Sequence, residues 1–347
     1  MIKKHFFTIA IIAIVLGLCS CSSGSSTEIS DEVLEQPEDV VTHSVAVFSS
    51  DDAINPKLIE DGFTDVLKEY YDDRITILDD NTQNADVIFC IGEKALANAL
   101  HVTSETPIVF SEVMDASKVL GESYESPEEK ITGINVTGLE ATPDIASQLS
   151  VIMEITKNLN QVGLFYSPED AVAKAQNKIM ETYLDEAGIA WKEYILPSDK
   201  YKKALSKATP KKKKSKLPKP KKIIKMACSE CSALYIPSHS SVSDYSKAIS
   251  NTAVRSKTTT FGGDMISAKH TLASLHVSES SVGFACAKIV VDILTNGRDV
   301  STTEIGNISS LSSKKVYNKD IAKLYGIDFP KSFTEVHSPD INSDNPL

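Results

Sequence analysis

Short hydrophobic runs alternate with amphipathic stretches along most of the chain. In the amphipathic stretches, apolar residues recur at the three- and four-residue spacing of a helix, as at Leu58, Ile59, Phe63, Val66, Leu67 and Tyr70. The runs typical of buried strands are "SVAVF" (44–48), "DVIFCIG" (86–92), "PIVFS" (107–111) and, after residue 142, "QVGLFY", "WKEYIL", "ALYIP" and "TTTFG". Such alternation predicts an α/β fold with parallel sheets covered by helices on both faces. About twelve elements suit two doubly wound sheets better than one.

Capping residues predict where several helices begin and end. Thr142 is the expected N-cap of a helix with Pro143 at its first position, and Ile145, Leu149 and Ile152 form its apolar stripe. A second helix is expected from about Asp170 to a stop at Gly188. A long helix from Ser280 to Asn296 is expected to end at Gly297.

The N-terminus has the pattern of an export signal. Lys3 and Lys4 precede a mainly apolar run from Phe6 to Leu18, which is too short to span a bilayer core of roughly 20 residues. Residues 1–20 are therefore interpreted as a signal peptide, which predicts an exported protein. "LCSC" resembles a bacterial lipobox, with Cys21 as the acylated residue. Residues 21–42 are Ser-rich and acidic and predict a flexible tether. A soluble secreted protein with a chance cysteine is the alternative.

Lysines cluster in one part of the chain although its net charge is −11. Thirteen lie between Lys200 and Lys225, with no acidic residue between Asp199 and Glu230. Outside the cytoplasm, nuclear import and nucleic-acid binding are excluded as roles for such a run. We expect residues 206–226 to be a solvated loop, because its prolines break helices and its charges repel. Attraction to anionic lipid or wall polymer is the alternative.

Cysteine and histidine patterns do not indicate a cofactor or a metal. Cys90 and Cys286 lie in apolar runs and are expected to be free and buried. Cys228 and Cys231 form an isolated CxxC, for which a local disulfide or two inert thiols is expected rather than half a zinc site or a redox pair. The histidines lack the spacing of a helical metal pair.

Small polar residues follow most of the expected strands. Ligands in open α/β sheets bind beyond the carboxyl ends of strands, where backbone N–H groups and loop side chains are exposed. The corresponding segments are "FSSDD" (48–52), "IGEKA" (91–95), "FSEVMD" (110–115), "FYSPED" (165–170), "IPSHSS" (236–241) and "FGGD" (261–264). These segments predict a cleft for a small polar ligand.

An ordered set of segments resembles one protein family. "ITGI" (131–134), "TPDIASQL", "VGLFYSPEDA", "ALYIPSHSSV" and "TFGGD…TLASL" resemble the bacterial ABC-transporter solute-binding lipoproteins of the aromatic amino-acid (tryptophan and tyrosine) type over roughly residues 43–330. The resemblance implies a type I periplasmic-binding-protein fold, in which two lobes joined by three crossings close on a solute and deliver it to an ABC permease. It places ligand contacts at Ser49, Ser50, Gly92, Glu93, Asp115, Ser167, Ser238, Ser240 and Asp264.

A zwitterionic amino acid needs donors for its carboxylate and an acceptor for its ammonium. Ser49, Ser50 and the Gly92 region suit the first need, and Asp115 or Asp264 suits the second. The sequence departs from the family at Glu93, where a small hydroxyl residue is usual, and at His239 and Ser240, where an Asp-Asn pair is usual. A ligand-sensing or scaffolding lipoprotein without transport is therefore the alternative function. No enzyme motif is present.

These observations predict a division of the chain. The signal peptide and the tether are followed by a first lobe of residues 43–133 and about 272–300. The second lobe contains about 134–271 and 301–333, and residues 334–347 form a C-terminal tail.

Overall fold

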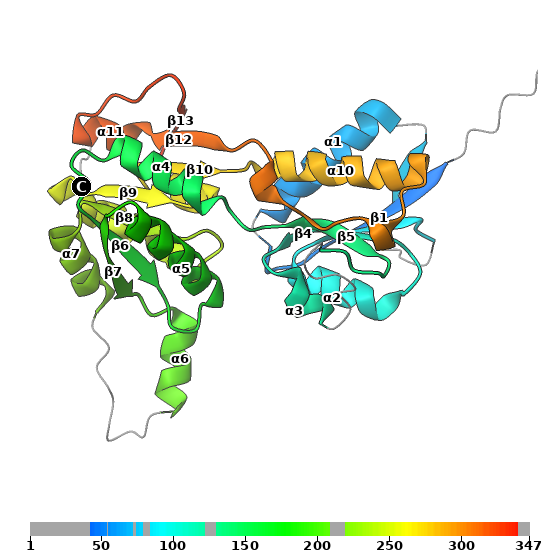
Figure 1. Cartoon of the computed structure of the whole chain (residues 1–347), viewed down its shortest axis with the longest axis horizontal. Coiled ribbons are helices and arrows are strands. Elements are labelled where there is room, and N and C mark those ends of the chain that lie inside the picture. The colour runs from blue at the N-terminus through cyan, green and yellow to red at the C-terminus, as the bar shows by residue number, and fades with distance from the viewer. Residues whose placement is uncertain are drawn as a thin grey trace, which may run out of the picture. The chain divides into compact units, whose positions relative to one another are not determined.

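A computed structural model describes residues 42–53, 55–71, 74–78, 84–121, 130–208 and 219–338. The expected signal peptide, Cys21, nearly all of the tether and the central lysines at 209–218 lie outside the described residues. Within the described ranges, no helix combines the length and the apolar character needed to cross a bilayer. Figure 1 shows the arrangement of the elements.

The first sheet contains six parallel strands in the order β11-β5-β4-β3-β1-β2. Its central strands β3 and β4 are buried along their whole length; β3 is apolar throughout, and β4 is apolar except at Ser111 and Glu112. The strands are β1 (His43–Ser49), β2 (Ile75–Leu78), β3 (Val87–Ile91), β4 (Ile108–Val113), β5 (Val136–Glu140) and β11 (Gly306–Asn307).

Helices cover both faces of this first sheet. One hydrophobic cluster joins the sheet to α1 (Pro56–Tyr71) and α10 (Glu279–Asn296). The cluster on the other face contains α2 (Glu93–Val102) and α3 (Ala116–Leu120). The expected stripe of α1 is buried at four positions, but Leu58 and Tyr70 are exposed because they flank the contact face. We call this sheet and its helices the first lobe.

The second sheet has seven strands in the order β13-β12-β10-β9-β8-β6-β7. Its pairs are parallel except that β12 runs antiparallel to β10. The strands are β6 (Gln161–Tyr166), β7 (Ala190–Ile195), β8 (Ala233–Ile236), β9 (Thr259–Gly262), β10 (Ala273–His276), β12 (Lys314–Asn318) and β13 (Thr334–Val336). Because β13 pairs with β12, the expected tail begins too early; three of its residues belong to the sheet.

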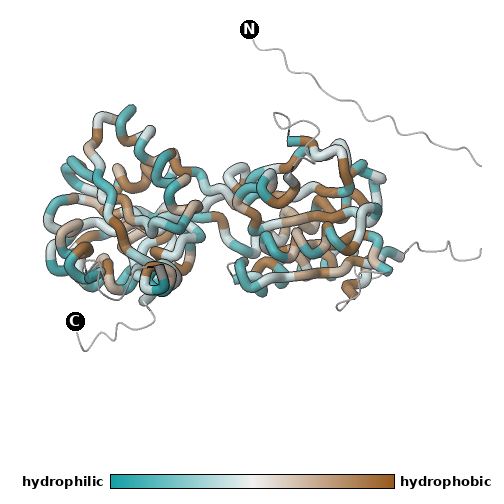
Figure 2. The backbone as a smooth tube through the Cα atoms, turned by 90° about the horizontal axis from the view of Figure 1, so that it is seen from below, coloured by the Kyte–Doolittle hydropathy of each residue, from teal (hydrophilic) through white to brown (hydrophobic). Residues whose placement is uncertain are grey.

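The helices of this second lobe bury two further clusters against its sheet. Figure 2 shows the more hydrophobic stretches of the backbone, which include these buried segments. The helices are α4 (Ile145–Ile155), α5 (Ala171–Glu186), α6 (Asp199–Ala208), α7 (Pro220–Glu230), α8 (Ser246–Ser256), α9 (Met265–Ala268) and α11 (Lys319–Tyr325), with a short 3-10 turn at η1 (Ser241–Tyr245). Two further 3-10 turns, η2 (Val300–Thr302) and η3 (Ile308–Ser310), flank β11 in the first lobe. The predicted α/β class with two mainly parallel sheets is thus confirmed.

The chain crosses between the two lobes three times. The crossings follow β5, β10 and η3. The expected division placed each boundary a few residues too early, because β5 and β11 belong to the first sheet and β10 to the second. A short apolar run predicts a strand, but it does not show which sheet the strand joins.

Helix ends agree with the capping patterns at three of four expected positions. Asp170 caps α5, Gly188 has a left-handed φ of 68°, and Gly297 ends α10. The expected cap at Thr142 is wrong. Asp144 caps α4 instead, because its carboxylate accepts from the Ser147 amide at 2.9 Å.

The expected lysine-rich loop is shorter than predicted. Residues 206–208 end α6, and residues 220–226 belong to α7. Pro220 lies in the first turn of α7, where a backbone N–H would have no partner within the helix, so proline's lack of an N–H costs no hydrogen bond. Ile223, Ile224, Ala227 and Cys228 then bury one side of the helix. Cys90, Cys228, Cys231 and Cys286 are all buried free thiols.

Candidate functional site

A small cavity lies where the three crossings meet. Its volume is about 40 Å³, close to the space of one water molecule and far below the roughly 300–1,000 Å³ of a ligand pocket. Residues from all three crossings contribute to its wall. The lining comprises Glu112, Ala141, Pro143, Asp144, Gln148, Ser238, His239, Gly263, Asp264, Met265, Leu275, His276, Val277, Glu279, Val282, Ile308 and Ser313.

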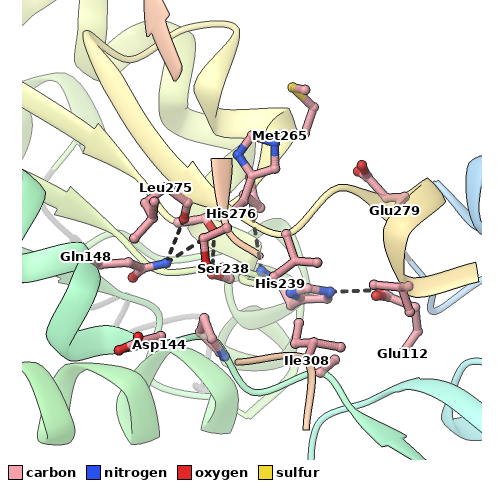
Figure 3. Close-up of a pocket in the computed structure, with 17 residues that line it drawn as sticks. Glu112, Asp144, Gln148, Ser238, His239, Met265, Leu275, His276, Glu279 and Ile308 are labelled. Carbon is pink, nitrogen blue, oxygen red and sulfur yellow. Dashed lines mark hydrogen bonds and ion pairs between the residues drawn. The ribbon is translucent and has the colours of Figure 1, made fainter. Parts of the chain in front are cut away.

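An ion pair joins the two lobes at this cavity (Figure 3). Glu112 Oε2 of β4 lies 2.8 Å from His239 Nε2, which belongs to the segment after β8. Only 5% of the Glu112 side chain and 17% of the His239 side chain are exposed. A hydrogen bond between charged groups shielded from water is much stronger than the same bond at the surface. The pair therefore forms a strong contact between the lobes.

Both partners have an unusual backbone conformation. The φ angle is 57° at Glu112 and 52° at His239, in the left-handed region that side chains other than glycine rarely adopt. Glu112 also lies in a bulge, since the pairing of β4 with β5 shifts register between Phe110 and Val113. Bulges redirect side chains and are common beside functional sites. The bulge accounts for a carboxylate directed away from an otherwise apolar strand.

Charge around His239 favours its protonated form. Burial by itself would lower the pKa of His239, but the Glu112 carboxylate, with smaller effects from Asp264 and Glu279, raises that pKa to about 9. The ring donates from Nε2 to Glu112, while Nδ1 is buried without a hydrogen-bond partner. A protonated ring thus has one N–H that a bound molecule could use.

His276 provides a second buried ring nitrogen without a partner. Its Nδ1 lies 3.2 Å from Ser274 Oγ, while Nε2 has no partner. Burial lowers the pKa of His276, so the ring is neutral near pH 7. In this state Nε2 can either accept or donate, depending on the tautomer. The cavity wall therefore contains two unsatisfied imidazole nitrogens, a condition that buried polar atoms in folded proteins rarely show.

Asp264 is held in place by the protein itself. Its carboxylate caps α9 through the Ser267 amide at 2.8 Å and the Ser267 hydroxyl at 2.7 Å. It also accepts from the backbone N–H of His239 at 3.1 Å and from Ser243 Oγ at 3.2 Å. Asp264 therefore lines the cavity and fixes the backbone that positions His239.

Ser238 and Asp264 are the two expected ligand residues that share this cavity. Ser238 is buried, and its hydroxyl donates to the Gly263 carbonyl at 2.7 Å. Ser240 is also buried and donates to the Pro237 carbonyl at 2.8 Å. Ser167 accepts from the Ser198 amide at 3.0 Å and donates to Glu169. These hydroxyls support loops of the second lobe.

The expected residues of the first lobe lie in two other places. Ser50, Gly92 and Glu93 surround the start of α2, where Ser50 Oγ accepts from the Ala95 amide at 3.2 Å. Gly92 has a φ of 106°, and a Cβ there would lie 2.3 Å from Ser50 Oγ, so only glycine fits. Ser49 ends β1 and is exposed. Asp115 directly precedes α3 without a side-chain hydrogen bond to its first turn of backbone N–H groups, and it pairs with Lys118 at 2.9 Å.

Sequence reasoning missed Gln148, His276 and Glu279 as cavity residues, and it included Glu112 only within the expected cleft segment 110–115. It noted His239 only as a departure from the family. Gln148 donates from Nε2 to the Leu275 carbonyl at 3.2 Å (Figure 3). It also accepts from the Tyr235 hydroxyl at 2.8 Å. A buried glutamine on an apolar helix stripe was a signal available in the sequence. The bulge at Glu112 left no signal that could be recognised in the sequence.

The arrangement suits recognition of a polar solute. Carboxylates and two imidazoles face a common space, and across the described ranges no three His, Cys, Asp or Glu side chains are grouped as metal ligands. These carboxylates and imidazoles can form hydrogen bonds and ion pairs with a bound molecule.

A comparison with protein families and a comparison with solved structures point to the same kind of protein. Residues 71–336 match the protein family described as ABC transporter substrate binding protein. No curated protein matches the chain. The solved structures that share the fold include three whose sequences are at most 20% identical to this chain.

The first is the ligand-free, open structure of a substrate-binding protein with adhesive properties from Clostridium difficile, with 18% identity, a TM-score of 0.70, and coverage of 86% of this chain and all of the other. The second is an ABC domain in complex with L-Trp from Streptococcus pneumoniae, with 20% identity, a TM-score of 0.58, and coverage of 83% and 96%. The third is a conserved domain protein from Vibrio cholerae, with 20% identity, a TM-score of 0.61, and coverage of 85% and 99%.

Proposed function

Because this chain belongs to the family of ABC transporter substrate-binding proteins, we propose that it captures an amino acid outside the cytoplasm and delivers it to an ABC permease. The observation that carries this proposal is the cavity at the three crossings, whose wall holds two unsatisfied imidazole nitrogens beside buried carboxylates. An aromatic amino acid is the first candidate, since one solved relative of this fold contains L-Trp. The protein has a binding role and no catalytic one.

The cavity residues suit the two ends of an amino acid. The free N–H of protonated His239 can donate to the ligand carboxylate, and His276 Nε2 can donate or accept beside it. Glu279 and Asp264 lie close enough to raise the pKa of His239, so they also attract an ammonium group. Glu279 already accepts from Asn55 Nδ2 at 2.8 Å, which holds its carboxylate in position.

Ligand entry must enlarge the cavity, because about 40 Å³ cannot hold an amino acid. We expect the lobes to rearrange about the crossings and to bring further loops to the solute. The contacts expected at Ser49, Ser50, Gly92, Glu93, Asp115, Ser167 and Ser240 form part of this proposal. Asp115 is the alternative partner for the ammonium, since it is only partly buried.

We also propose that Cys21 carries lipid and anchors the protein to the outer face of a bacterial membrane. The supporting observations are the signal-like first 20 residues and the small residue Ser20 directly before Cys21. Two or more acyl chains hold a protein stably on a bilayer. An anchored binding protein would remain near its permease.

A thermal-shift screen over amino acids tests the solute role. A ligand that binds the folded state alone raises stability by RT ln(1 + [L]/Kd), or about 2.7 kcal/mol at a hundred times Kd. A ligand found in this way should bind more weakly to His239→Gln, whereas His101→Gln, which alters an exposed histidine on α2, should bind as wild type does. Unchanged binding by His239→Gln would reject the cavity as the site.

The small cavity favours a second candidate function. Since the Glu112–His239 pair lies in the wall of a cavity of only about 40 Å³, the alternative is a sensing or scaffolding lipoprotein that has kept the fold without transport. Permease and ATPase genes beside its own gene would support uptake. Their absence, together with no stabilising solute in the screen, would support the second function.

A further inference from the structure

Helix α6 has basic and apolar residues on separate sides. With 100° between successive residues of a helix, Tyr201, Ala204 and Leu205 fall within one arc of its surface. Lys203 and Lys207 fall on the other side, one turn apart. Helices of this composition, with lysines opposite Tyr and Leu, are typical of segments that lie in a membrane interface.

The apolar side of α6 remains partly exposed to solvent. Ala204 is exposed, while Tyr201 and Leu205 are half-buried and belong to no hydrophobic cluster of the described residues. The first turn alone is fastened, because Lys202 donates to the Tyr245 hydroxyl at 2.9 Å and that hydroxyl donates to the Pro197 carbonyl at 2.7 Å. Figure 1 shows the rest of α6 projecting away from the second sheet.

Several lysines of this region have no close carboxylate partner, although Lys202 pairs with Asp199 at 2.8 Å. Within the described ranges, Lys203 and Lys207 are exposed and form no ion pair, and the same holds for Lys221, Lys222 and Lys225 on α7. By contrast, the chain as a whole has a net charge of −11. A positive region on an acidic protein attracts anionic partners locally.

We propose that α6 binds the surface of an anionic phospholipid bilayer. Tyr201 and Leu205 enter the boundary between headgroups and acyl chains, and Lys203 and Lys207 extend to the phosphates. A soluble or wall polyanion would use the lysines and leave the apolar side in water, so the two-sided helix favours a bilayer. This contact is separate from solute binding and does not depend on acylation of Cys21.

Vesicle binding by the full chain tests the proposal. The Cys21→Ser form should be used throughout, because it cannot be acylated. We expect it to bind vesicles of phosphatidylcholine mixed with phosphatidylglycerol and not vesicles of pure phosphatidylcholine. Replacing Lys203 and Lys207 with Gln should weaken binding roughly 25-fold, since each basic residue near such a surface contributes roughly fivefold, or about 1 kcal/mol.

Two further variants make the result specific. Lys68→Gln with Lys174→Gln removes the same charge from exposed sites on α1 and α5 and should leave vesicle binding unchanged. Leu205→Ser keeps the charge and should weaken vesicle binding without lowering the melting temperature, because Leu205 packs in no hydrophobic cluster. The proposal fails if wild type does not bind anionic vesicles or if the Lys68 and Lys174 control weakens binding equally. It also fails if Leu205→Ser binds as wild type does while soluble polyphosphate competes fully, since α6 would then bind polyanions.

Discussion

Glu112 and His239 each have a left-handed backbone conformation, and their side chains meet at 2.8 Å across the two lobes. Left-handed residues other than glycine cost roughly 1–3 kcal/mol each and persist where their surroundings hold them. At Glu112 a bulge in β4 supplies this constraint. At His239 the constraint is the hydrogen bond that its backbone N–H donates to the Asp264 carboxylate at 3.1 Å. Strained residues of both lobes therefore converge on one ion pair.

The ion pair predicts a pH dependence of stability. Folding raises the pKa of His239 from its ordinary 6.5 to about 9, mainly through Glu112. The folded state thus binds a proton more tightly than the unfolded state, so this stabilisation is complete below about pH 6.5 and is lost as pH rises through 9. We expect the free energy of unfolding to fall by on the order of 1–3 kcal/mol across this window, measured by urea titration.

His239→Gln should remove most of that dependence. Its free energy of unfolding should vary little between pH 6.5 and 9, apart from effects of other groups, and should be lower than that of wild type at pH 6.5 because Glu112 loses its charged partner. The control is His101→Gln, which changes an exposed side chain. An equal slope in His239→Gln and wild type would show that another group is responsible.

Asp264→Ala should affect both stability and binding. The substitution removes four hydrogen bonds to one carboxylate, including the cap of α9, so we expect a loss of about 2–4 kcal/mol in unfolding free energy. Under the proposed function, affinity for an amine-bearing solute should also fall by roughly thirtyfold or more. Calorimetry at a temperature where the variant is folded separates these effects. A stable variant with unchanged affinity would leave Asp115 as the candidate partner for the ammonium.

Much of the fold could be predicted from the sequence, because hydrophobic spacing reports local structure directly. The sequences at β3, β4 and β6 are mainly apolar, and each was predicted to be a buried strand, as it is. Gly297 ends α10 as expected. The sheet to which each strand belongs was harder to predict from the sequence. Whether β10 joins the first or the second sheet depends on contacts with strands distant in the chain, which no local pattern encodes.

The site was harder to predict for a related reason. Ser238 and Asp264 follow strands, so the rule for α/β sheets led to these two residues, which line the cavity. Glu112 lies inside the strand β4 and reaches the cavity only through a bulge. The partner of His239 likewise comes from the other lobe, 127 positions away in the sequence. Pairings of this kind depend on tertiary structure.

The corrected extent of α7 can be tested by two substitutions on the same helix. Ile224 is 1% exposed and packs in the cluster beneath α7, so Ile224→Ala should lower the free energy of unfolding by about 2–4 kcal/mol. Met226 is 42% exposed, and Met226→Ala should have an effect of less than about 1 kcal/mol. Equal, small effects of both substitutions in urea titrations would indicate that residues 220–226 form the solvated loop that the sequence suggested.

Cys21→Ser tests the proposed anchor in the native host. Without acylation, the processed protein should move from the membrane fraction toward the soluble fraction, leaving at most the weaker, salt-sensitive binding proposed for α6. Fractionation in high salt separates the two contributions. Mass spectrometry of the wild-type N-terminus should find diacylglycerol on Cys21. A wild-type protein that is membrane-bound in high salt and carries no lipid would contradict the proposal.

The close contact of α1 with α10 predicts a strict requirement for glycine at residue 283. A Cβ on Gly283 would lie 2.0 Å from the Ile59 carbonyl oxygen and 2.7 Å from the Phe63 amide nitrogen, so α1 would have to move. Gly283 is helical, and alanine would otherwise favour a helix by about 1 kcal/mol. We nevertheless expect Gly283→Ala to lower the unfolding free energy by about 1–3 kcal/mol, because the steric conflict is with backbone atoms that have no alternative rotamer. Lys288→Ala, an exposed change on the same helix, is the control and should be nearly neutral. A Gly283→Ala protein as stable as wild type in urea would mean that α1 and α10 are farther apart than these distances require.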